Sequence, residues 1–363
     1  MRSQARQPSV GHDGWVLIEL MGNDEPSILF EGSRWKPFSR LDRRSRVHPS
    51  VSMTNQLRAI ADRVRHSDHL QGGLIVEQWS SGATDERGYL VAEPIFGPPA
   101  DPRPYAVLVW IGSGAPPECA RTVGTMMWDP RNILTYHSEV TETRILGNDP
   151  PVYERTSPEV FKHFRDYPKE HALGPWVASV QDGSVSEEET FHDTIEIERT
   201  DGELLNVHLA MKAVETPQGW LIRGVVHDIS DMEAPTGQQG YSRRTARAFA
   251  SVLDDAAVEI GALATVNFAT GIILEWLTPP PPPIDEWRNT NGTWGDFERV
   301  SSHIKLVADG GASVSKFSNT VTFPDSPRPI PIAVTVYPAT QGQGLAGAGI
   351  MRIEVKDDLL LAW

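Results

Sequence analysis

Apolar and polar residues alternate or cluster between Trp15 and Ile111 in a pattern that predicts five strands and one helix. The expected strands are Trp15–Leu20, Ser27–Glu31, Leu74–Trp79, Gly88–Ile95 and Tyr105–Ile111. Between the second and third strands, apolar residues recur at helical spacing and predict a helix over residues 50–66. This ββαβββ order buries one face of an antiparallel sheet against a helix.

The segment from about residue 125 to 232 repeats this mixture of strands and helices. Its pattern predicts opening strands at Ile133–His137 and Glu142–Leu146, and a helix that begins with Ser157 as N-cap and Pro158 as first residue. A second helix is expected at Leu173–Gln181. It ends at the turn Asp182-Gly183. The closing strands are expected at Thr190–Arg199, Leu204–Val214 and Trp220–Ile229.

The segment from 242 to 358 can be laid on the second segment almost without gaps in its C-terminal half. In this register Asp182-Gly183 falls on Asp309-Gly310, and Val207 and Leu209 fall on Val334 and Val336. The register predicts an internal duplication in which the last two units superpose. The elements expected here are a helix at Arg243–Asp255, strands at Leu263–Phe268 and Ile272–Trp276, and a stiff connector at Pro279–Pro283.

The middle segment closes on the strand Arg223-Gly224-Val225-Val226-His227-Asp228-Ile229-Ser230, after helices that precede an Asp-Gly turn. With these features, Met127 to Met232 resembles a PAS domain. The first unit is similar to the related GAF fold, and the third is similar to a degenerate PAS copy. The resemblance implies an α+β fold of three tandem units, at residues 1–120, 125–233 and 242–358, each with a sheet of about five antiparallel strands. PAS and GAF domains usually bind small ligands or each other, so it also implies a sensory or scaffolding role.

Charge and composition exclude some classes of function. The 363 residues carry a net charge of −15, which argues against general nucleic-acid binding. The longest apolar run, Ala106 to Ile111, is too short to span a membrane, and the first residues lack a secretory signal, so we expect a cytoplasmic protein.

The charge is unevenly distributed along the chain. Residues 1–65 hold 11 basic and 7 acidic residues, against 22 and 41 in the remainder. The first unit is therefore expected to attract an acidic partner, including the rest of its own chain.

A dense basic cluster precedes the predicted helix of the first unit. Its arginines suit an acidic protein partner or a phosphate group, and a solvated loop is the alternative interpretation. The partner-binding candidates are Arg40, Arg43, Arg44 and Arg46.

The middle unit holds the candidate ligand pocket. One face of the strand Leu204–Val214 is apolar and faces the predicted helical region, which is either a filled core or the wall of a pocket for a small apolar ligand. The wall candidates are Phe161, Phe164, Trp176, Val207, Leu209 and Met211, with His163 or His171 as polar contacts. The PAS resemblance also places these two histidines where a haem ligand is often found, although ordinary packing is the favoured interpretation and we expect no cofactor.

Other motifs favour plain structural roles. Gly342–Gly347 matches the dinucleotide fingerprint, but a strand follows it instead of the helix that such a site requires. His66, Asp68 and His69 lie at the exposed end of a predicted helix, so we expect no metal site. Cys119 is the single cysteine, which excludes an internal disulfide. No nucleophile, base and orienting residue form a recognisable arrangement, so an enzyme is not expected.

These observations predict a non-catalytic sensory or regulatory protein that acts through small-ligand binding and protein–protein contacts. The alternative is a ligand-free scaffold that assembles a homodimer or a larger complex. In both cases self-association is expected, because repeated sheets each have a second face to cover.

Overall fold

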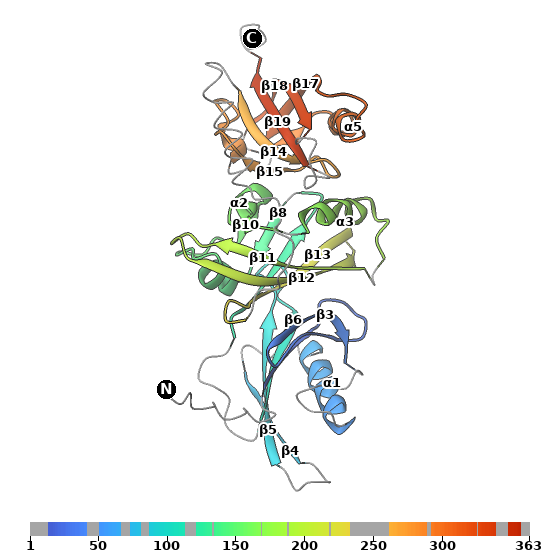
Figure 1. Cartoon of the computed structure of the whole chain (residues 1–363), viewed down its shortest axis with the longest axis vertical. Helices are drawn as coiled ribbons and strands as arrows, with labels where there is room; N and C mark the ends of the chain where they lie inside the picture. Colours follow the sequence, from blue (N-terminus) through green and yellow to red (C-terminus); the bar gives the residue numbers. More distant parts are fainter. Residues whose placement is uncertain are drawn as a thin grey trace, which may run out of the picture.

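The fold of the protein is known from a computed structural model. It describes residues 14–41, 51–66, 73–80, 87–112, 121–132, 134–167, 169–186, 189–217, 219–232, 261–288, 292–324, 326–338 and 348–356. Within these residues the chain forms three antiparallel sheets, which Figure 1 shows one above another along the long axis of the molecule. About 50% of the described residues are in strands and 20% in helices, so the expected α+β class is confirmed. The sheets have six, seven and six strands where about five each were expected.

The first sheet has the strand order β3-β2-β1-β6-β5-β4, and α1 (Val51–Arg65) covers its inner face. Its strands are β1 (Gly14–Glu19), β2 (Ser27–Glu31), β3 (Arg34–Arg40), β4 (Ile75–Ser80), β5 (Arg87–Phe96) and β6 (Pro104–Gly112). The predicted helix and all five predicted strands are present. Strand β3, which the sequence pattern did not indicate, extends the hairpin at the edge of the sheet.

The second sheet has the order β10-β11-β12-β13-β7-β8-β9. Its strands are β7 (Val123–Asp129), β8 (Leu134–His137), β9 (Glu154–Thr156), β10 (Phe164–Asp166), β11 (Thr190–Glu198), β12 (Leu204–Thr216) and β13 (Gly219–Asp228). Two α-helices, α2 (Ser157–Phe161) and α3 (Glu170–Asp182), lie against its inner face. The three closing strands and α3 agree with the sequence prediction.

Two predictions for the second unit are wrong. Residues Glu142–Leu146 do not form a strand, because Thr141–Ile145 wind into a π-helical turn, η1, that carries the Glu142 side chain into the interior. The helix expected to begin at Ser157 as N-cap instead has Thr156 as N-cap, since Thr156 and Glu159 form a capping box. This helix stops at Phe161, and the chain continues into edge strand β10.

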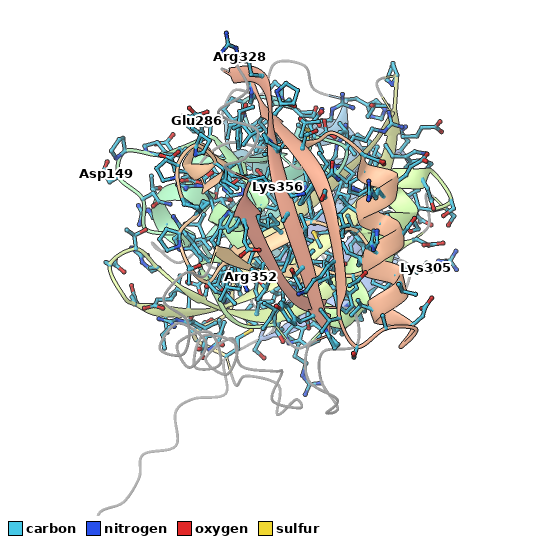
Figure 2. The ribbon with its side chains drawn as sticks, turned by 90° about the horizontal axis from the view of Figure 1, so that it is seen from above. Asp149, Glu286, Lys305, Arg328, Arg352 and Lys356 are labelled. Carbon is cyan, nitrogen blue, oxygen red and sulfur yellow. The ribbon has the colours of Figure 1, made fainter. Side chains whose placement is uncertain are left out.

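The third sheet has the order β15-β14-β19-β18-β17-β16, and α5 lies beside it, as the view along the long axis shows (Figure 2). Its elements are β14 (Ala262–Asn267), β15 (Ile273–Trp276), η2 (Asp285–Arg288), β16 (Thr293–Trp294), α5 (Phe297–Ala308), β17 (Ser315–Phe323), β18 (Ser326–Pro338) and β19 (Ala348–Val355). The expected strands Leu263–Phe268 and Ile272–Trp276 are confirmed within one residue. The predicted helix Arg243–Asp255 lies outside the described residues.

The register that lays Asp182 on Asp309 matches elements of the second and third units. Helices α3 and α5 end within one residue of each other in this register. Both are followed by a glycine in the left-handed conformation, Gly183 with φ 75° and Gly310 with φ 72°. Val207 and Val334 are buried in the cores of their units, as the register requires. In all three sheets the first strand of the unit lies between its hairpin partner and the last strand of the unit, and the preceding strands follow as an antiparallel meander. This shared order fits a tandem GAF/PAS-like arrangement.

The outer faces of the first and second sheets pack against each other. Leu17, Phe30 and Leu108 of the first sheet form one buried cluster with Ala210 and Val225 of the second. Each sheet therefore has two covered faces, a helix-covered face and the face at this junction. Sheet-on-sheet burial of this kind joins the two units into one packed body.

The third unit contacts the second at the opposite side. Ile272 and Leu274 of the third unit are 2% and 4% exposed, because they pack into the aromatic core of the second unit beside α2. Asn267 approaches α3 so closely that a Cβ atom at Gly174 would lie 2.2 Å from its amide nitrogen. Only glycine allows this approach of α3 to the end of β14. The middle unit is thus enclosed on both sides.

Candidate functional site

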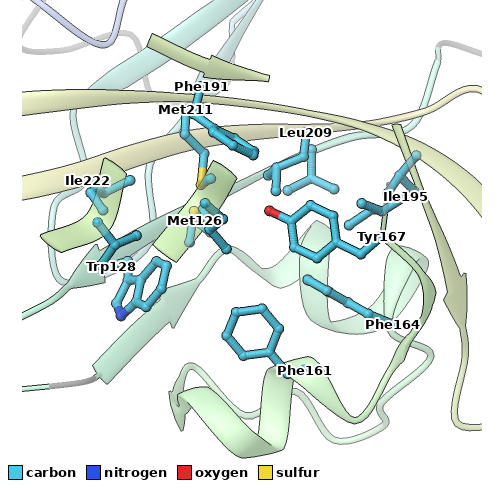
Figure 3. Close-up of a cluster of buried hydrophobic side chains, with 14 of the residues drawn as sticks. Met126, Trp128, Phe161, Phe164, Tyr167, Phe191, Ile195, Leu209, Met211 and Ile222 are labelled. Carbon is cyan, nitrogen blue, oxygen red and sulfur yellow. The ribbon is translucent and has the colours of Figure 1, made fainter. Parts of the chain in front are cut away.

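The inner face of the middle sheet carries a continuous set of aromatic side chains. Phe161 contacts Phe164 edge to face, with 5.2 Å between the ring centroids, and Phe164 contacts Tyr167 at 5.5 Å. Tyr167 in turn contacts Phe191 on strand β11. Figure 3 shows the rings of Phe161, Phe164 and Tyr167 facing Met126, Leu209 and Met211 on the sheet. Such edge-to-face pairs hold the rings in fixed positions.

The six predicted wall residues all belong to this core. Phe161, Phe164, Val207, Leu209 and Met211 are buried, and the half-buried Trp176 packs against Phe191 at 5.7 Å between ring centroids. The structure therefore brings the six together, and they contact each other and their neighbours. Whether a ligand enters among them stays a prediction.

The two histidines proposed as polar contacts differ. His163 lies between α2 and β10, is 5% exposed, and hydrogen-bonds through Nδ1 to the carbonyl oxygen of Glu198 at 3.0 Å. Burial, with added repulsion from Lys162 and Arg155, lowers the pKa of His163 to about 4, so the ring is neutral at physiological pH. His171 is in the first turn of α3.

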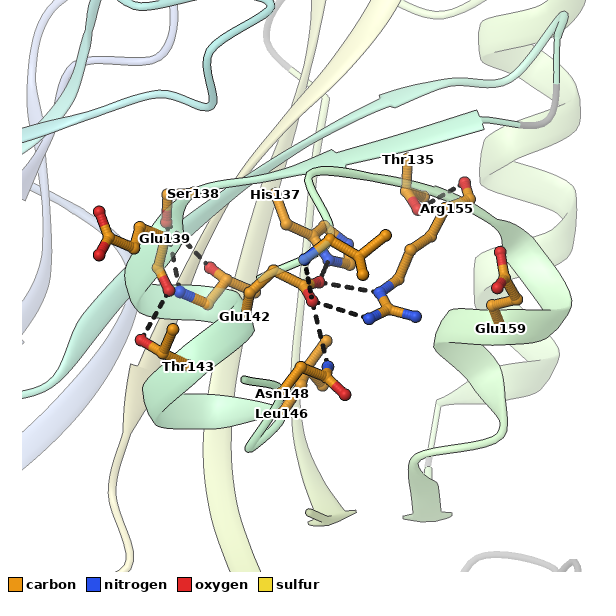
Figure 4. A network of polar contacts seen from close by, with 12 residues as sticks. Thr135, His137, Ser138, Glu139, Glu142, Thr143, Leu146, Asn148, Arg155 and Glu159 are labelled. Atoms are coloured by element: carbon orange, nitrogen blue, oxygen red, sulfur yellow. Dashed lines mark hydrogen bonds and ion pairs between the residues drawn. The ribbon is translucent and has the colours of Figure 1, made fainter. Parts of the chain in front are cut away.

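A buried ionic network holds the π-helical turn of the second unit. Glu142 is fully buried and accepts hydrogen bonds from Arg155 at 2.9 and 2.8 Å, while His137 Nδ1 lies 2.6 Å from its Oε1 (Figure 4). Burial alone would raise the pKa of Glu142, but the hydrogen bonds from His137 and Arg155 outweigh it and lower the pKa to about 2. The carboxylate is ionised, and both oxygens are used, since Asn148 and the Val152 amide also donate to it. This network therefore serves structure and leaves no free oxygen for chemistry.

Histidines and aromatic rings fill the junction between the first and second sheets. His208 and His227 are cross-strand partners on the outer face of β12 and β13, and they are 1% and 0% exposed. Trp35 of the first unit lies over His208 at 5.0 Å, and Phe30 meets His227 edge to face at 4.8 Å. No described residue hydrogen-bonds to either ring nitrogen of His227. Burial lowers the pKa of both histidines to about 3, so both are neutral.

Buried ion pairs cross the same junction. Lys212 of the second sheet is 3% exposed and pairs with Asp24 and, at 3.9 Å, with Glu19 of the first unit. Arg223 donates to Asp101 at 2.8 Å and to the carbonyl oxygen of Met21 at 2.6 Å. The first unit supplies carboxylates and the second supplies cations. This is the reverse of the expected attraction between a basic first unit and an acidic remainder, because the net charge of a unit does not determine the charges on one face.

A groove of about 560 Å³ opens beside this junction, between the β2–β3 turn and the segments that flank the second sheet. Its lining residues are Ser33, Arg34, Trp35, Arg121, Asp231 and Met232. Arg121 makes a bidentate pair with Asp231 at 2.9 and 3.0 Å, and its guanidinium lies 4.5 Å above the Phe30 ring centroid. Residues from two units line this groove together.

Other sequence candidates lie elsewhere. Arg40 ends β3 and is exposed, whereas Arg43, Arg44 and Arg46 lie outside the described residues, as do Cys119, Asp68 and His69, and Gly342–Gly347. Within the described part of the chain, no group of three or more metal-binding side chains is found, and no helix is long and apolar enough to cross a membrane. Trp287, beyond the proline-rich connector, is 6% exposed and packs against Trp276, Trp294 and Phe323, so it belongs to the core of the third unit.

Sequence reasoning missed the junction and its groove. The pattern His208, Ala210, Lys212 on one face of β12 resembles the solvated face of a half-buried strand, and nothing local to it tells that a second sheet covers it. The usable signal was indirect, because β1 and β6 are apolar on both faces, and a strand with two apolar faces requires cover on both sides.

The three units share their strand order, and together they form an α+β protein whose arrangement fits tandem GAF/PAS-like domains. Residues 14–119 match a family model described as Rv3651-like, N-terminal. The model covers less than half of the chain, so the match concerns the first unit. None of the curated proteins matches this chain.

Comparison with solved structures supports the whole architecture. An uncharacterized protein from Mycobacterium tuberculosis aligns with a TM-score of 0.62 over 97% of this chain and 98% of its own, at 19% identity. A sensory box histidine kinase/response regulator from Burkholderia thailandensis aligns over 38% of this chain and 90% of its own, with a TM-score of 0.23 and 14% identity. An RNA-binding light-oxygen-voltage receptor aligns over 66% and 96%, with a TM-score of 0.23 and 11% identity. The first comparison shows a shared fold, and the other two are too distant to support an argument.

Proposed function

We propose that this chain is a non-catalytic sensory or regulatory protein that acts through small-ligand binding and through contacts between units and with a partner protein. The observation that carries the proposal is the enclosure of the middle unit. Its core contains Ile272 and Leu274 of the third unit, and its outer face is buried under the first. A change in the packing of the middle unit therefore has to alter its contacts with both neighbours, which is how a sensing unit is coupled to an output surface.

The proposed coupling is tested by removing the contact from the third unit. Leu274→Lys places a charge in the aromatic core, so we expect faster amide hydrogen exchange in α2 and α3. The matched control is Leu306→Lys on α5, where the side chain is 45% exposed and the exchange should stay at the wild-type rate. Equal exchange in α2 for both variants would contradict the coupling.

The sensory function is tested with a thermal-shift screen of small molecules on the full chain. A ligand at a hundredfold excess over its Kd stabilises the folded state by about 2.7 kcal/mol. The proposal expects that such a compound also changes hydrogen exchange in β15 and α2. A compound that raises the melting temperature without changing hydrogen exchange in β15 or α2 would bind the protein but would contradict a sensory function.

A ligand-free scaffold is the second candidate function. The specific observation in its favour is that the predicted wall residues of the middle unit already contact one another. If the protein is a scaffold, we expect a homodimer or larger complex whose stability does not depend on any compound in the screen. Native mass spectrometry at several protein concentrations distinguishes the two, because the scaffold requires association and the sensor requires a bound small molecule.

A further inference from the structure

The groove beside the junction of the first two units has the size and lining of a small-molecule site. Its volume of about 560 Å³ lies within the range of roughly 300–1,000 Å³ that is usual for such sites. Ser33, Arg34 and Trp35 come from the first unit, whereas Asp231 and Met232 follow the last strand of the second sheet. A molecule bound here contacts both units at once.

The charges of the groove favour an anion. Arg121 and Asp231 neutralise each other through their bidentate pair. Arg34 is exposed, and no carboxylate in the described part of the chain pairs with it. Among the residues that the structure describes, its planar guanidinium is therefore the uncompensated charge of the groove, and it can donate two parallel hydrogen bonds to a carboxylate.

The remaining lining favours a flat ring. Trp35 is held in place by the neighbouring His208 and His192 rings, at 5.0 and 6.0 Å between centroids, so its indole is a fixed surface. Met232 adds a polarisable thioether, which makes favourable contacts with aromatic rings.

We propose that this groove binds a small aromatic carboxylate, with the ring against Trp35 and Met232 and the carboxylate on Arg34. The inference deepens the proposed function, and it rests on that function for the step from binding to regulation. Because the ligand bridges the two units, its binding strengthens their junction. The site then regulates by fixing how the first sheet lies on the second.

The test is isothermal titration calorimetry of the full chain with naphthoate and with its neutral isostere naphthamide. Loss of a charge-assisted pair should weaken naphthoate binding about tenfold in Arg34→Gln while the affinity for naphthamide is unchanged. Met232→Glu, which places a negative charge in the groove, should weaken the binding of naphthoate more than that of naphthamide. The matched control is Arg299→Gln, an exposed arginine on α5 of the third unit, which should bind as the wild-type does.

Three outcomes would overturn the site: no saturable heat with naphthoate and wild-type protein, equal weakening in Arg34→Gln and Arg299→Gln, or equal affinity for naphthoate and naphthamide. Arg34 is exposed and Met232 is only partly buried, so both variants are expected to fold, and circular dichroism checks this. Binding with the expected variant pattern but without slower hydrogen exchange in β2 and β13 would support the site and count against the proposed regulatory function.

Discussion

The two faces of the middle sheet bury different chemistry although they belong to the same strands. On β12, Val207 and Leu209 point into an apolar aromatic core, while His208 and Lys212 point into a junction with buried charges and histidines. Any well-packed apolar surface can cover an apolar face, whereas a buried charge requires a partner of opposite charge at a fixed position. The inner face therefore contributes stability, and the outer face fixes how the first unit is placed.

The largest expected effect is at the buried lysine of the outer face. Lys212→Met removes the cation beside Glu19, which is 1% exposed, and should lower the free energy of unfolding by about 4 kcal/mol. Burial raises the pKa of Glu19 and Lys212 lowers it, so the loss should be greater at high pH, where the lone carboxylate is ionised. Urea denaturation measures the change. The double variant with Glu19→Gln should recover part of the loss, and no recovery would contradict a charge effect.

A smaller but still large effect is expected on the inner face. Leu209→Ala removes buried methyl groups from the aromatic core and should cost about 3 kcal/mol through lost burial and a residual cavity. Hydrogen exchange in β1 and β2 should change less than in Lys212→Met, because these strands lie beyond the opposite face. If Leu209→Ala released the first unit as strongly as Lys212→Met does, the distinction between the faces would be wrong. Val76→Ala, at a residue 61% exposed, is the control.

The histidines of the outer face predict acid sensitivity. The folded pKa of His208 is about 3 against an ordinary 6.5, so the unfolded chain takes up the proton first. Its contribution to stability is complete above pH 6.5 and is lost as the pH falls toward 3. Between pH 7 and 5.5 the protonation of this single group lowers the free energy of unfolding by about 1 kcal/mol. His208→Leu should reduce the pH dependence of the free energy of unfolding by that amount, as measured by urea denaturation at pH 7 and pH 5.5.

The smallest effect is expected for an ion pair that is exposed on both sides. Arg58 Nη2 lies 2.6 Å from Glu25 Oε1, with the side chains 38% and 48% exposed. Arg58→Gln should change the free energy of unfolding by less than about 1 kcal/mol. The same urea titration as for Lys212→Met provides the comparison. A loss as large as that of Lys212→Met would show that burial is not what makes the junction pairs strong.

Periodicity was sufficient to predict most of the fold. The meander of the second unit was predicted within one or two residues, and the Asp-Gly pair that ends α3 and α5 identified matching elements of the last two units. These features depend on interactions within a few residues, so the chain carries them locally.

The parts that were missed depend on residues far apart in the sequence. Glu142 looks like a polar position of a short strand until Arg155 and His137 are known to lie around it. Lys212 looks solvated until Asp24, 188 residues earlier, is placed beside it. The groove is missed for the same reason, because its two walls come from different units.

Leu274 has a consequence for how such a chain can evolve. Tandem domains are often described as modules that recombination can move between proteins. Here a leucine of the third unit is part of the hydrophobic interior of the second, so a gene fragment that encodes residues 125–235 alone specifies an incomplete core. Exchange of either unit for a homologous one has to preserve the fit of this side chain, and the second and third units are therefore expected to be inherited together.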